Sequence, residues 1–576
     1  MREQPRNAGT ALAQTLVDEL ARCGVGHACL APGSRSSPLA VAFAEHEDIA
    51  VHVEIDERSA AFLGLGLGMA TRRPAAVLCT SGTAAANFFP AVVEAAQARV
   101  PLIVVTADRP PELRHTGANQ TIDQIKLYGR FTRWFCELGT PENRPGQVPY
   151  WRSVVCRAVA AALGGPPGPV HLNVGLREPL TNEPDAAGFD QDISGRAGGK
   201  PWTRHRPGPR RPPDEMIAEI AARFGSASRG LVVAGAGVRA PDGVRAFAER
   251  AGWPLLADTI SGARCGPNAI ASYDLLLASE EFAAEMRPDI ILRVGNVQVS
   301  KSLLRWLSAD VEQVLIDPDG ESLDGARAVS EIVAGDPAET LEAIAKALPA
   351  PEDGAWLEGW QSADKTAEAA VEEVLQKEPG LSEPEVAQVV VQSVPHGTTI
   401  AVASSMPVRD LNTCARPRPG LEFISNRGAS GIDGFVSTSL GAAIGSQTPV
   451  VALSGDLSLL HDQNGFLLAE RDEIDATFVV LNNDGGGIFS LLPQARNQRH
   501  FETLFGTPHG TSFERLAAMY GLGYVRARDT LELRAALDRF VGQTGVGIVE
   551  IRTDRRANAE LHLRLRHAVI HALSGR

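Results

Sequence analysis

The sequence of 576 residues has few cysteines, and none of them lie close together along the chain. The seven cysteines, at positions 23, 29, 79, 136, 156, 265 and 414, include no Cys-x-x-Cys pair. Their odd number and wide spacing argue against a disulfide framework. We therefore expect reduced, mostly buried thiols, as is usual in the cytoplasm.

Long apolar segments and an excess of positive charge are missing as well. The N-terminal segment MREQPRNAGT lacks the apolar core of a signal peptide. The longest apolar run, Ala60 to Ala70, has 11 residues, whereas a membrane helix needs about 20. The net charge of −14 argues against nucleic acid or a membrane surface as a partner. A site for an anionic substrate must therefore be built locally, from arginines and helix N-termini.

What the sequence does contain is one pattern repeated in three stretches, which start at Ala75, Gly230 and Val450. In each, an apolar β-rich run is followed by a Gly or Ser turn, a helical segment and a second apolar run. Continuous apolar strands that alternate with helices predict parallel sheets covered on both faces. The expected fold class is therefore α/β, with doubly wound parallel sheets.

Changes in composition suggest where the domains begin and end. Residues 181–213 are rich in Pro, Gly and Arg, and residues 348–380 in Ala, Glu and Pro, which is typical of linkers. We expect three α/β domains between and beside them, at 1–180, 214–347 and 381–576. The length agrees, since at roughly 150 residues per domain a chain of this size has three or four domains.

Polar residues follow two strands of the third stretch. VVALS leads to Gly455-Asp456 and TFVVLN to Asn482-Asn483, and we expect the segment between them to form one crossover helix. Strands joined in this way are parallel and often adjacent, so Asp456 and Asn483 should meet at the sheet edge where such folds bind ligands. A carboxylate, an amide oxygen and the carbonyl of Gly485 would suit Mg²⁺ or Mn²⁺.

The backbone N–H groups at the start of the crossover helix, in Asp456-Leu457-Ser458, could receive a diphosphate. Simpler explanations exist for each piece. An Asp before Ser at a strand–helix junction is often only an N-cap, and NNDGGG could be a plain loop. Asp56 and Glu57, at the start of a predicted helix, could merely complement the helix dipole. The turn VVAGAG lacks the third glycine of a dinucleotide motif and is expected to be structural.

Taken together, two motifs resemble those of thiamine-diphosphate enzymes. Gly-Asp followed later by Asn-Asn is their metal and diphosphate signature, although Leu457 stands where glycine is usual. The segment from Glu57, E-R-S-A-A-F, resembles their Glu-x-x-Ala-Ala-Phe. The resemblance implies pyrimidine-binding, central and diphosphate-binding domains, in a homodimer or homotetramer with active sites at the subunit interface. It also implies that Glu57 hydrogen-bonds the aminopyrimidine of the cofactor and acts in acid–base chemistry.

Four further strings resemble a narrower family: APGSRSSPLA, TADRPPELRHTGANQTIDQ, SNRGASGIDG and GIFSLLPQ. They are similar to the 2-succinyl-5-enolpyruvyl-6-hydroxy-3-cyclohexene-1-carboxylate synthases of menaquinone biosynthesis. That resemblance implies a magnesium-dependent transferase that decarboxylates 2-oxoglutarate and adds the product to isochorismate. Both substrates are dicarboxylates, which arginine binds well through its planar, two-pronged guanidinium group.

The resemblance also implies roles for individual residues. The expected catalytic residues are Glu57, Gln120 and Arg427. The expected cofactor-binding residues are Glu57, Ile432, Asp456, Leu457, Ser458, Asn483, Gly485 and Phe489, of which Asp456, Asn483 and Gly485 would hold the metal. The expected substrate-binding residues are Ser34, Arg35, Arg109, Asn119, Gln120, Lys301, Ser405, Arg409 and Arg427. One departure is Ser302, since the position after the lysine is often basic in the family.

Two other functions are compatible with parts of the pattern. The first is another thiamine-diphosphate enzyme, either a 2-oxo-acid decarboxylase or an acetohydroxyacid-synthase-like enzyme. The set of arginines and the string SNRGASGID argue against it. The second is a non-catalytic binding or regulatory subunit with the same fold. Because Glu57, Asp456 and Asn483 are all present, we favour an enzyme.

Overall fold

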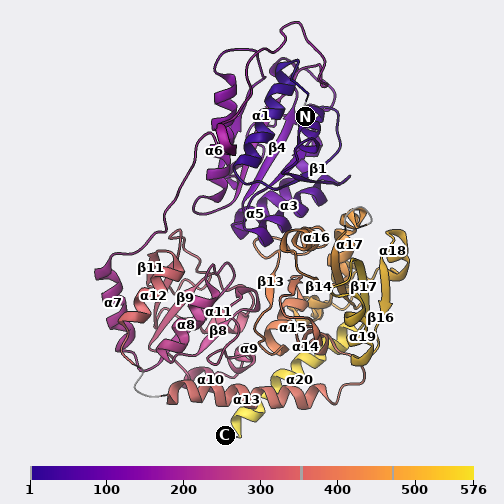
Figure 1. Cartoon of the computed structure of the whole chain (residues 1–576). Helices are drawn as coiled ribbons and strands as arrows, with labels where there is room; N and C mark the ends of the chain where they lie inside the picture. Colours follow the sequence, from indigo (N-terminus) through magenta and orange to yellow (C-terminus); the bar gives the residue numbers. More distant parts are fainter. Residues whose placement is uncertain (1–2, 351–353, 470–472, 576) are drawn as a thin grey trace. The chain divides into compact units, whose positions relative to one another are not determined.

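The computed structural model describes residues 3–350, 354–469 and 473–575. It contains three parallel β-sheets, each packed with helices (Figure 1), which confirms the expected fold class. The chain divides into two compact units. The first unit is Met1–Pro207, Asn426–Gln447 and Ser458–Asp475, and the second is Gly208–Ser425, Thr448–Leu457 and Ala476–Arg576.

The first sheet belongs to the first unit and has the strand order β2-β1-β3-β4-β6-β5. Its strands are β1 (His27–Leu30), β2 (Ala50–Val53), β3 (Ala75–Cys79), β4 (Leu102–Asp108), β5 (Trp134–Glu137) and β6 (Pro169–Gly175). The accompanying helices are α1 (Ala8–Arg22), α2 (Ser37–Ala44), α3 (Glu57–Thr71), α4 (Thr83–Asn87), α5 (Phe89–Ala98) and α6 (Gln147–Leu163). Helices α1, α2 and α6 share one apolar core with the sheet, and α3 and α5 contact the strands separately from that core.

Helix α3 packs very closely against α16 (Phe435–Ser446), which is also in the first unit. A Cβ atom on Gly66 would lie 2.0 Å from the carbonyl oxygen of Thr438, and one on Gly441 would lie 2.1 Å from that of Leu63. Glycine is a poor helix former, but here it allows the two backbones to touch. This packing explains the Gly-rich apolar run at residues 60–70.

The second sheet has the order β11-β10-β9-β7-β8. Its strands are β7 (Gly230–Ala234), β8 (Leu255–Ala257), β9 (Ile290–Val294), β10 (Glu312–Asp317) and β11 (Glu331–Ala334). The helices are α7 (Asp214–Gly225), α8 (Pro241–Ala251), α9 (Tyr273–Leu276), α10 (Glu280–Glu285), α11 (Lys301–Trp306), α12 (Pro337–Ala347) and α13 (Ala355–Leu375). Alternate strand residues face two cores, one with α7, α8 and α12 and the other with α9, α11 and α13.

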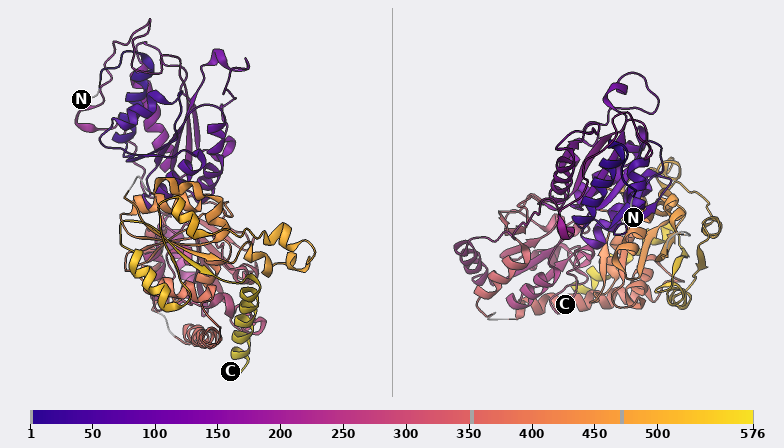
Figure 2. Two further views of the ribbon diagram at one scale, coloured as in Figure 1. Left: turned by 90° about the vertical axis from the view of Figure 1, so that its right-hand side faces the viewer. Right: turned by 45° about the horizontal axis from the view of Figure 1, so that its top comes forward.

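The third sheet has the order β13-β12-β14-β15-β17-β16. Its strands are β12 (Thr399–Val402), β13 (Glu422–Ile424), β14 (Val450–Gly455), β15 (Asp475–Asn482), β16 (Gly523–Arg526) and β17 (Gly545–Arg552). Other elements of this region are α14 (Glu383–Ser393), α15 (Met406–Cys414), α17 (Asp456–His461), α18 (Phe513–Met519), α19 (Thr530–Phe540) and α20 (Arg555–Ser574). Helices α14, α15 and α19 share a core with this sheet. Helix α20, yellow in Figures 1 and 2, packs against α13.

The glycine turn VVAGAG after β7 has a structural explanation. A Cβ atom on Gly235 would lie 2.2 Å from the backbone of Asn296, and Ala236 forms an isolated bridge with the same residue. The turn therefore needs glycine because the chain after β9 passes directly against it.

The crossover after β14 differs from the expected single helix. The short helix α17 ends at His461, and the 3₁₀-helix Gln463–Leu468 follows it. A Cβ atom on Gly465 would lie 2.5 Å from the hydroxyl of Ser437. Because Asn464-Gly465 is a weak helix former and packs tightly at this point, the chain leaves the α-helical path.

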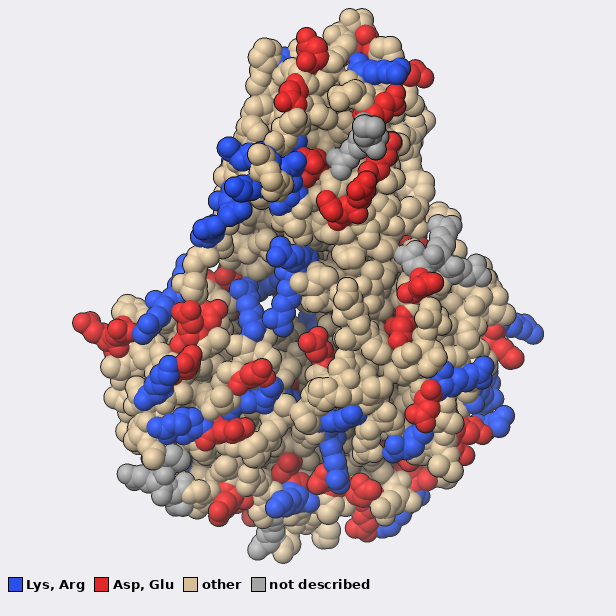
Figure 3. Space-filling model, in the orientation of Figure 1, with Lys and Arg blue, Asp and Glu red and all other residues tan. Residues whose placement is uncertain are grey.

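Two surface properties follow from the composition. Across the described residues, every helix is either too short or too polar to cross a bilayer. Acidic and basic side chains are both spread over the face shown in Figure 3. Arginines can therefore form local groups on the surface even though the net charge of the chain is negative.

A buried carboxylate joins three elements of the first unit. Asp462 accepts the N–H of Ser437 at 2.7 Å and the hydroxyl of Ser59, on α3, at 3.2 Å. Asp462 has no exposed surface, and burial raises its pKa to about 6 although these hydrogen bonds act in the opposite direction. The ionised form is therefore costly to hold in the folded state.

This carboxylate predicts a pH effect on stability. The folded-state pKa of Asp462 lies above the unfolded value of 3.8. Its favourable contribution to the free energy of unfolding is therefore complete below pH 3.8 and is lost as the pH rises towards 6. Relative to Asp462→Asn, the free energy of unfolding of the wild type should fall by at most about 3 kcal/mol over this range. Urea unfolding at several pH values measures the difference. The exposed Asp48→Asn is the control, and a pH-independent difference for Asp462→Asn would refute the prediction.

Candidate active site

Strands β14 and β15 are adjacent and parallel, with Val450 opposite Ala476 and Gly455 opposite Leu481. Asp456 and Asn483 directly follow these strands, so the predicted neighbours do lie at one edge of the third sheet. Strand β12 pairs with the other side of β14, with Val402 opposite Leu453. Ser405 and Arg409 therefore emerge at the same edge.

The Asp456 carboxylate is buried and held by short hydrogen bonds. It accepts the N–H of Gly485 at 2.8 Å and that of Leu457 at 2.7 Å, and His509 Nε2 lies 3.2 Å from Oδ2. Burial raises the pKa of Asp456 despite these donors. Within the described part of the chain, the His509 imidazole is the only basic side chain within ion-pair distance of this carboxylate. A divalent cation beside the carboxylate would stabilise the ionised form.

Asn483 presents one amide oxygen that has no partner. Its Nδ2 donates to Glu383 Oε1 at 2.9 Å, whereas its buried Oδ1 meets no hydrogen-bond donor among the described residues. Glu383 is itself buried on α14 and also accepts the hydroxyl of Thr553 at 2.8 Å. A buried amide oxygen without a donor fits a magnesium ligand, which needs a lone pair and no proton.

The loop after β15 needs glycine for two reasons. Gly485 has φ = +137°, which is a left-handed conformation, and a Cβ atom there would lie 1.8 Å from the carbonyl oxygen of Gly506. The carbonyl of Gly485 accepts the N–H of Gly487 at 3.0 Å.

Farther along the chain, the half-buried Phe489 packs against Phe505, with the two rings tilted and their centroids 5.5 Å apart. Leu457 is half-buried and Ser458 is buried in α17.

Glu57 is the first residue of α3, and this helix is capped by Asp56, whose side chain accepts the N–H of Arg58 at 2.9 Å. The Glu57 side chain is half-buried, and its Oε2 accepts from Asn87 Nδ2 at 3.3 Å. The preceding strand β2 pairs with β1, with Val53 opposite Leu30. Glu57 therefore lies at the edge of the first sheet where the strands end.

Several predicted substrate residues meet at that same edge. Arg35, buried after β1, donates to the carbonyl of Leu176 at 2.9 Å, and burial and the charge of Arg109 lower its pKa. Arg109, after β4, donates to the carbonyl of Asn119 at 3.3 Å. Gln120 has φ = +54° and donates to the carbonyl of Ser81 at 3.1 Å. The side chains of Asn119 and Gln120, like that of Ser34, remain exposed.

The other predicted residues lie on separate elements. In the first unit, Arg427 and Ile432 are half-buried in the loop that precedes α16. In the second unit, Arg409 is half-buried on α15 and donates to the carbonyl of Ser405, and burial lowers its pKa. Lys301 begins α11 beside the second sheet and is exposed.

Three supporting residues were missed because nothing in their local sequence marks them. Glu383 and His509 contact Asn483 and Asp456 from distant segments. Glu94, fully buried on α5, accepts the N–H groups of residues 428–430 in three bonds of 2.7 Å and so holds the loop that carries Arg427. Each acts through tertiary contacts.

Comparison with known proteins agrees with this arrangement. Residues 10–127 match the thiamine pyrophosphate enzyme N-terminal TPP binding domain, residues 196–402 the middle domain, and residues 408–551 the C-terminal TPP binding domain. Benzoylformate decarboxylase from Polynucleobacter necessarius has a similar fold, with a TM-score of 0.71 at 17% identity over 94% of this chain and 98% of that one. The chain is thus a thiamine-diphosphate enzyme by fold and domain content.

Sequence relatives narrow this class. A 2-succinyl-5-enolpyruvyl-6-hydroxy-3-cyclohexene-1-carboxylate synthase from Thermobifida fusca is 46% identical over 98% of this chain and all of its own length. A protein of the same name from Halobacterium salinarum is 43% identical over 96% of this chain and 97% of its own. The chain belongs to the 2-succinyl-5-enolpyruvyl-6-hydroxy-3-cyclohexene-1-carboxylate synthase family.

The bond between Glu383 and Asn483 predicts an effect on cofactor affinity. Glu383→Leu removes the acceptor that orients the amide, and loss of such a supporting contact typically lowers metal affinity by about 10- to 100-fold. Glu383→Gln keeps an acceptor oxygen and should lose less. Magnesium-dependent binding of thiamine diphosphate, followed by calorimetry, measures the change. Glu385→Gln is the control, because Glu385 binds Thr530 instead; wild-type affinity in Glu383→Leu would contradict the prediction.

Proposed function

We propose that this chain decarboxylates 2-oxoglutarate and joins the remaining four-carbon unit to isochorismate, forming 2-succinyl-5-enolpyruvyl-6-hydroxy-3-cyclohexene-1-carboxylate and CO₂. The observation that carries the proposal is 43–46% identity to synthases of that name over nearly the whole chain. A different thiamine-diphosphate enzyme is less well supported, since benzoylformate decarboxylase shares the fold at only 17% identity.

The cofactor site we propose follows from the edge of the third sheet. Asp456 and Asn483 would hold Mg²⁺, or Mn²⁺, with a backbone carbonyl from the Gly485 loop. The N–H groups of Leu457 and Ser458 would face the diphosphate. Thiamine diphosphate, when bound, supplies the carbon nucleophile that allows a 2-oxo acid to lose CO₂. Ile432 and Phe489 would pack against the cofactor and keep water away from the reacting atoms.

The roles proposed for the remaining residues rest on their charge and position. Glu57 would hydrogen-bond the aminopyrimidine and move a proton there. Arg35, Arg109, Arg409 and Arg427 would bind substrate carboxylates, with help from Ser34, Asn119, Gln120, Lys301 and Ser405. Arg35 and Arg109 support this assignment, because burial and the nearby charge of Arg109 lower the pKa of Arg35, and two neighbouring guanidinium groups attract anions. Arg427 and Gln120 would also act at the reacting atoms.

The first test is consumption of isochorismate, followed by absorbance with mass detection of the product. The wild type should consume isochorismate only when 2-oxoglutarate, thiamine diphosphate and Mg²⁺ are all present. Glu57→Gln keeps the size of the side chain but loses its acid–base function, so the rate should fall by about 100-fold or more.

Different outcomes separate the parts of this proposal. Release of CO₂ from another 2-oxo acid, with isochorismate untouched, would refute the substrates and leave the cofactor assignment standing. A fully active Glu57→Gln variant would refute the role of Glu57. Glu47→Gln, an exposed carboxylate elsewhere in the first unit, is the matched control and should retain wild-type activity.

We also propose a homodimer, or a homotetramer built from dimers, with each active site formed by two subunits. The accompanying domain division is 1–180 for pyrimidine binding, 214–347 for the central domain and 381–576 for diphosphate binding, with linkers at 181–213 and 348–380. The positions of the three sheets support this division, and the second linker contains α13, whose buried face packs into a core of the second sheet.

Mixing two inactive variants tests the shared site. If Glu57 of one subunit acts with Asp456 of another, a heterodimer of Glu57→Gln and Asp456→Ala contains one intact site out of two. Co-expression with two different affinity tags should then yield about half of the wild-type activity per dimer. An inactive heterodimer, with each homodimer folded, would show that every subunit builds its own site.

A further inference from the structure

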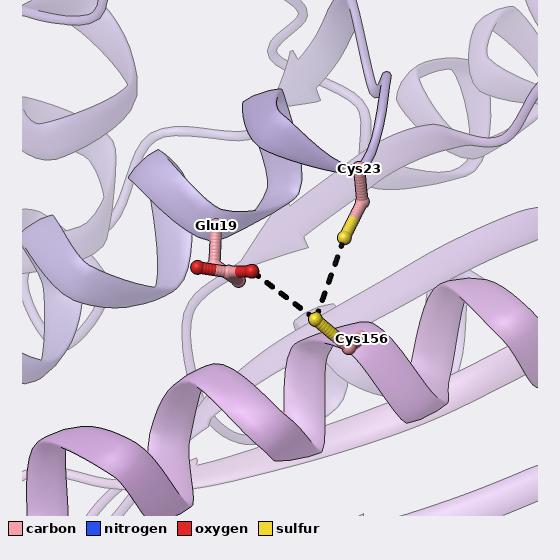
Figure 4. A group of neighbouring side chains, drawn as sticks. All are labelled: Glu19, Cys23 and Cys156. Carbon is pink, nitrogen blue, oxygen red and sulfur yellow. Dashed lines mark hydrogen bonds between the residues drawn. The ribbon is translucent and has the colours of Figure 1, made fainter. Parts of the chain in front are cut away.

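Three side chains with metal-binding atoms converge in the first unit, and none of them has a role in the proposed reaction. Glu19 and Cys23 lie at the C-terminal end of α1, and Cys156 lies on α6 (Figure 4). Cys23 Sγ is 3.7 Å from Cys156 Sγ, which is 3.1 Å from Glu19 Oε1. One donor atom from each of the three residues lies within 4.8 Å of the others.

These distances are close to the edges of a tetrahedral metal site. Zinc bonds of about 2.3 Å to sulfur and about 2.0 Å to oxygen separate two sulfurs by about 3.8 Å, and a sulfur from an oxygen by about 3.5 Å. The observed 3.7 Å and 3.1 Å therefore need only small shifts of side chains. Cysteine sulfur and carboxylate oxygen are both ligands that zinc accepts, and the two thiols favour a thiophilic ion.

Surrounding groups hold two of the donors in place. The N–H of Thr203 donates to Cys156 Sγ at 3.3 Å, and the N–H of Trp202 donates to Glu19. Arg152 binds the other oxygen of Glu19. Supporting hydrogen bonds of this kind orient metal ligands in proteins.

Burial and charge suit a bound cation. Glu19 has no exposed surface and Cys156 is 2% exposed, whereas Cys23 is half-buried and offers a route from solvent. Two thiolates and Glu19 carry three negative charges, which a divalent ion and Arg152 balance. The neighbouring Asp18, which also reaches Arg152, is paired with Arg22 at 2.7 Å.

The position of the cluster separates it from the catalytic residues. Helix α1 ends shortly before β1 begins at His27, so Cys23 lies towards the edge where the strands start. Glu57, Arg35 and Arg109 follow the ends of strands, at the opposite edge. A ligand in the cluster would therefore link helices α1 and α6, whose core packing supports the sheet.

We propose that Glu19, Cys23 and Cys156 form a structural binding site for one thiophilic divalent cation of the Zn²⁺ class, with water as the fourth ligand. The ion replaces the two thiol protons, which pass to solvent. It cross-links α1 to α6, and its ligands Glu19 and Cys156 accept hydrogen bonds from the segment at Trp202-Thr203. This site is distinct from the magnesium site at Asp456.

The test is metal binding to the full-length protein, reduced with a phosphine and freed of transition metals. Titration with Zn²⁺ against a chromophoric chelator should give about one tight equivalent per chain, and Cd²⁺ should produce a thiolate charge-transfer band in the near ultraviolet. Cys23→Ser and Cys156→Ser should each weaken binding by about 100-fold. Glu19→Gln should weaken it less. Cys136→Ser, a half-buried cysteine outside the cluster, should bind as the wild type does.

A stability measurement accompanies the titration, because a ligand that binds only the folded state raises the melting temperature. Zn²⁺ should raise the melting temperature of the wild type and of Cys136→Ser, but not that of Cys23→Ser, whose half-buried position tolerates serine. Equal binding by wild type and Cys23→Ser would overturn the proposal. So would reduced wild-type protein that binds no Zn²⁺, or a thiol pair that closes to a disulfide, two hydrogens lighter, in the presence of Zn²⁺.

Discussion

The parallel pairing of β14 with β15 is the constraint on which the site depends. It brings Asp456 and Asn483, far apart in the sequence, to one edge of a rigid sheet. The pairing with β12 adds Ser405 and Arg409 to that edge. Because the strands are parallel, their ends coincide, and the adjoining turns can be specialised without disturbing the core.

Around this pair, polar groups from elsewhere in the chain set the orientation of each atom proposed to bind the metal. Glu383 binds the amide nitrogen of Asn483 and so leaves the oxygen without a donor. The N–H of Gly485 fixes Asp456, in a loop conformation that only glycine adopts easily. Buried carboxylates are expensive unless they are hydrogen-bonded, and both Asp456 and Glu383 meet that condition.

The first unit relies on close backbone contact instead. Gly66 and Gly441 let α3 and α16 touch, and Asp462 bonds to both helices. Glu57 begins α3, and the loop with Arg427 and Ile432, which Glu94 holds, leads into α16. The cysteine and glutamate cluster between α1 and α6 lies on another part of this unit, where it bears on helix packing rather than on the reaction.

The sequence by itself determined the α/β class, the three parallel sheets and the convergence of Asp456 with Asn483. Those features follow from local periodicity and from the handedness of strand–helix–strand connections, which are properties of neighbouring residues. Only the tertiary structure decided where α17 ends, and that Glu383, His509 and Glu94 support the site. It also brought Cys23 and Cys156 into contact. Such contacts join segments more than 50 residues apart, and no local pattern encodes which distant side chain will fill a given space.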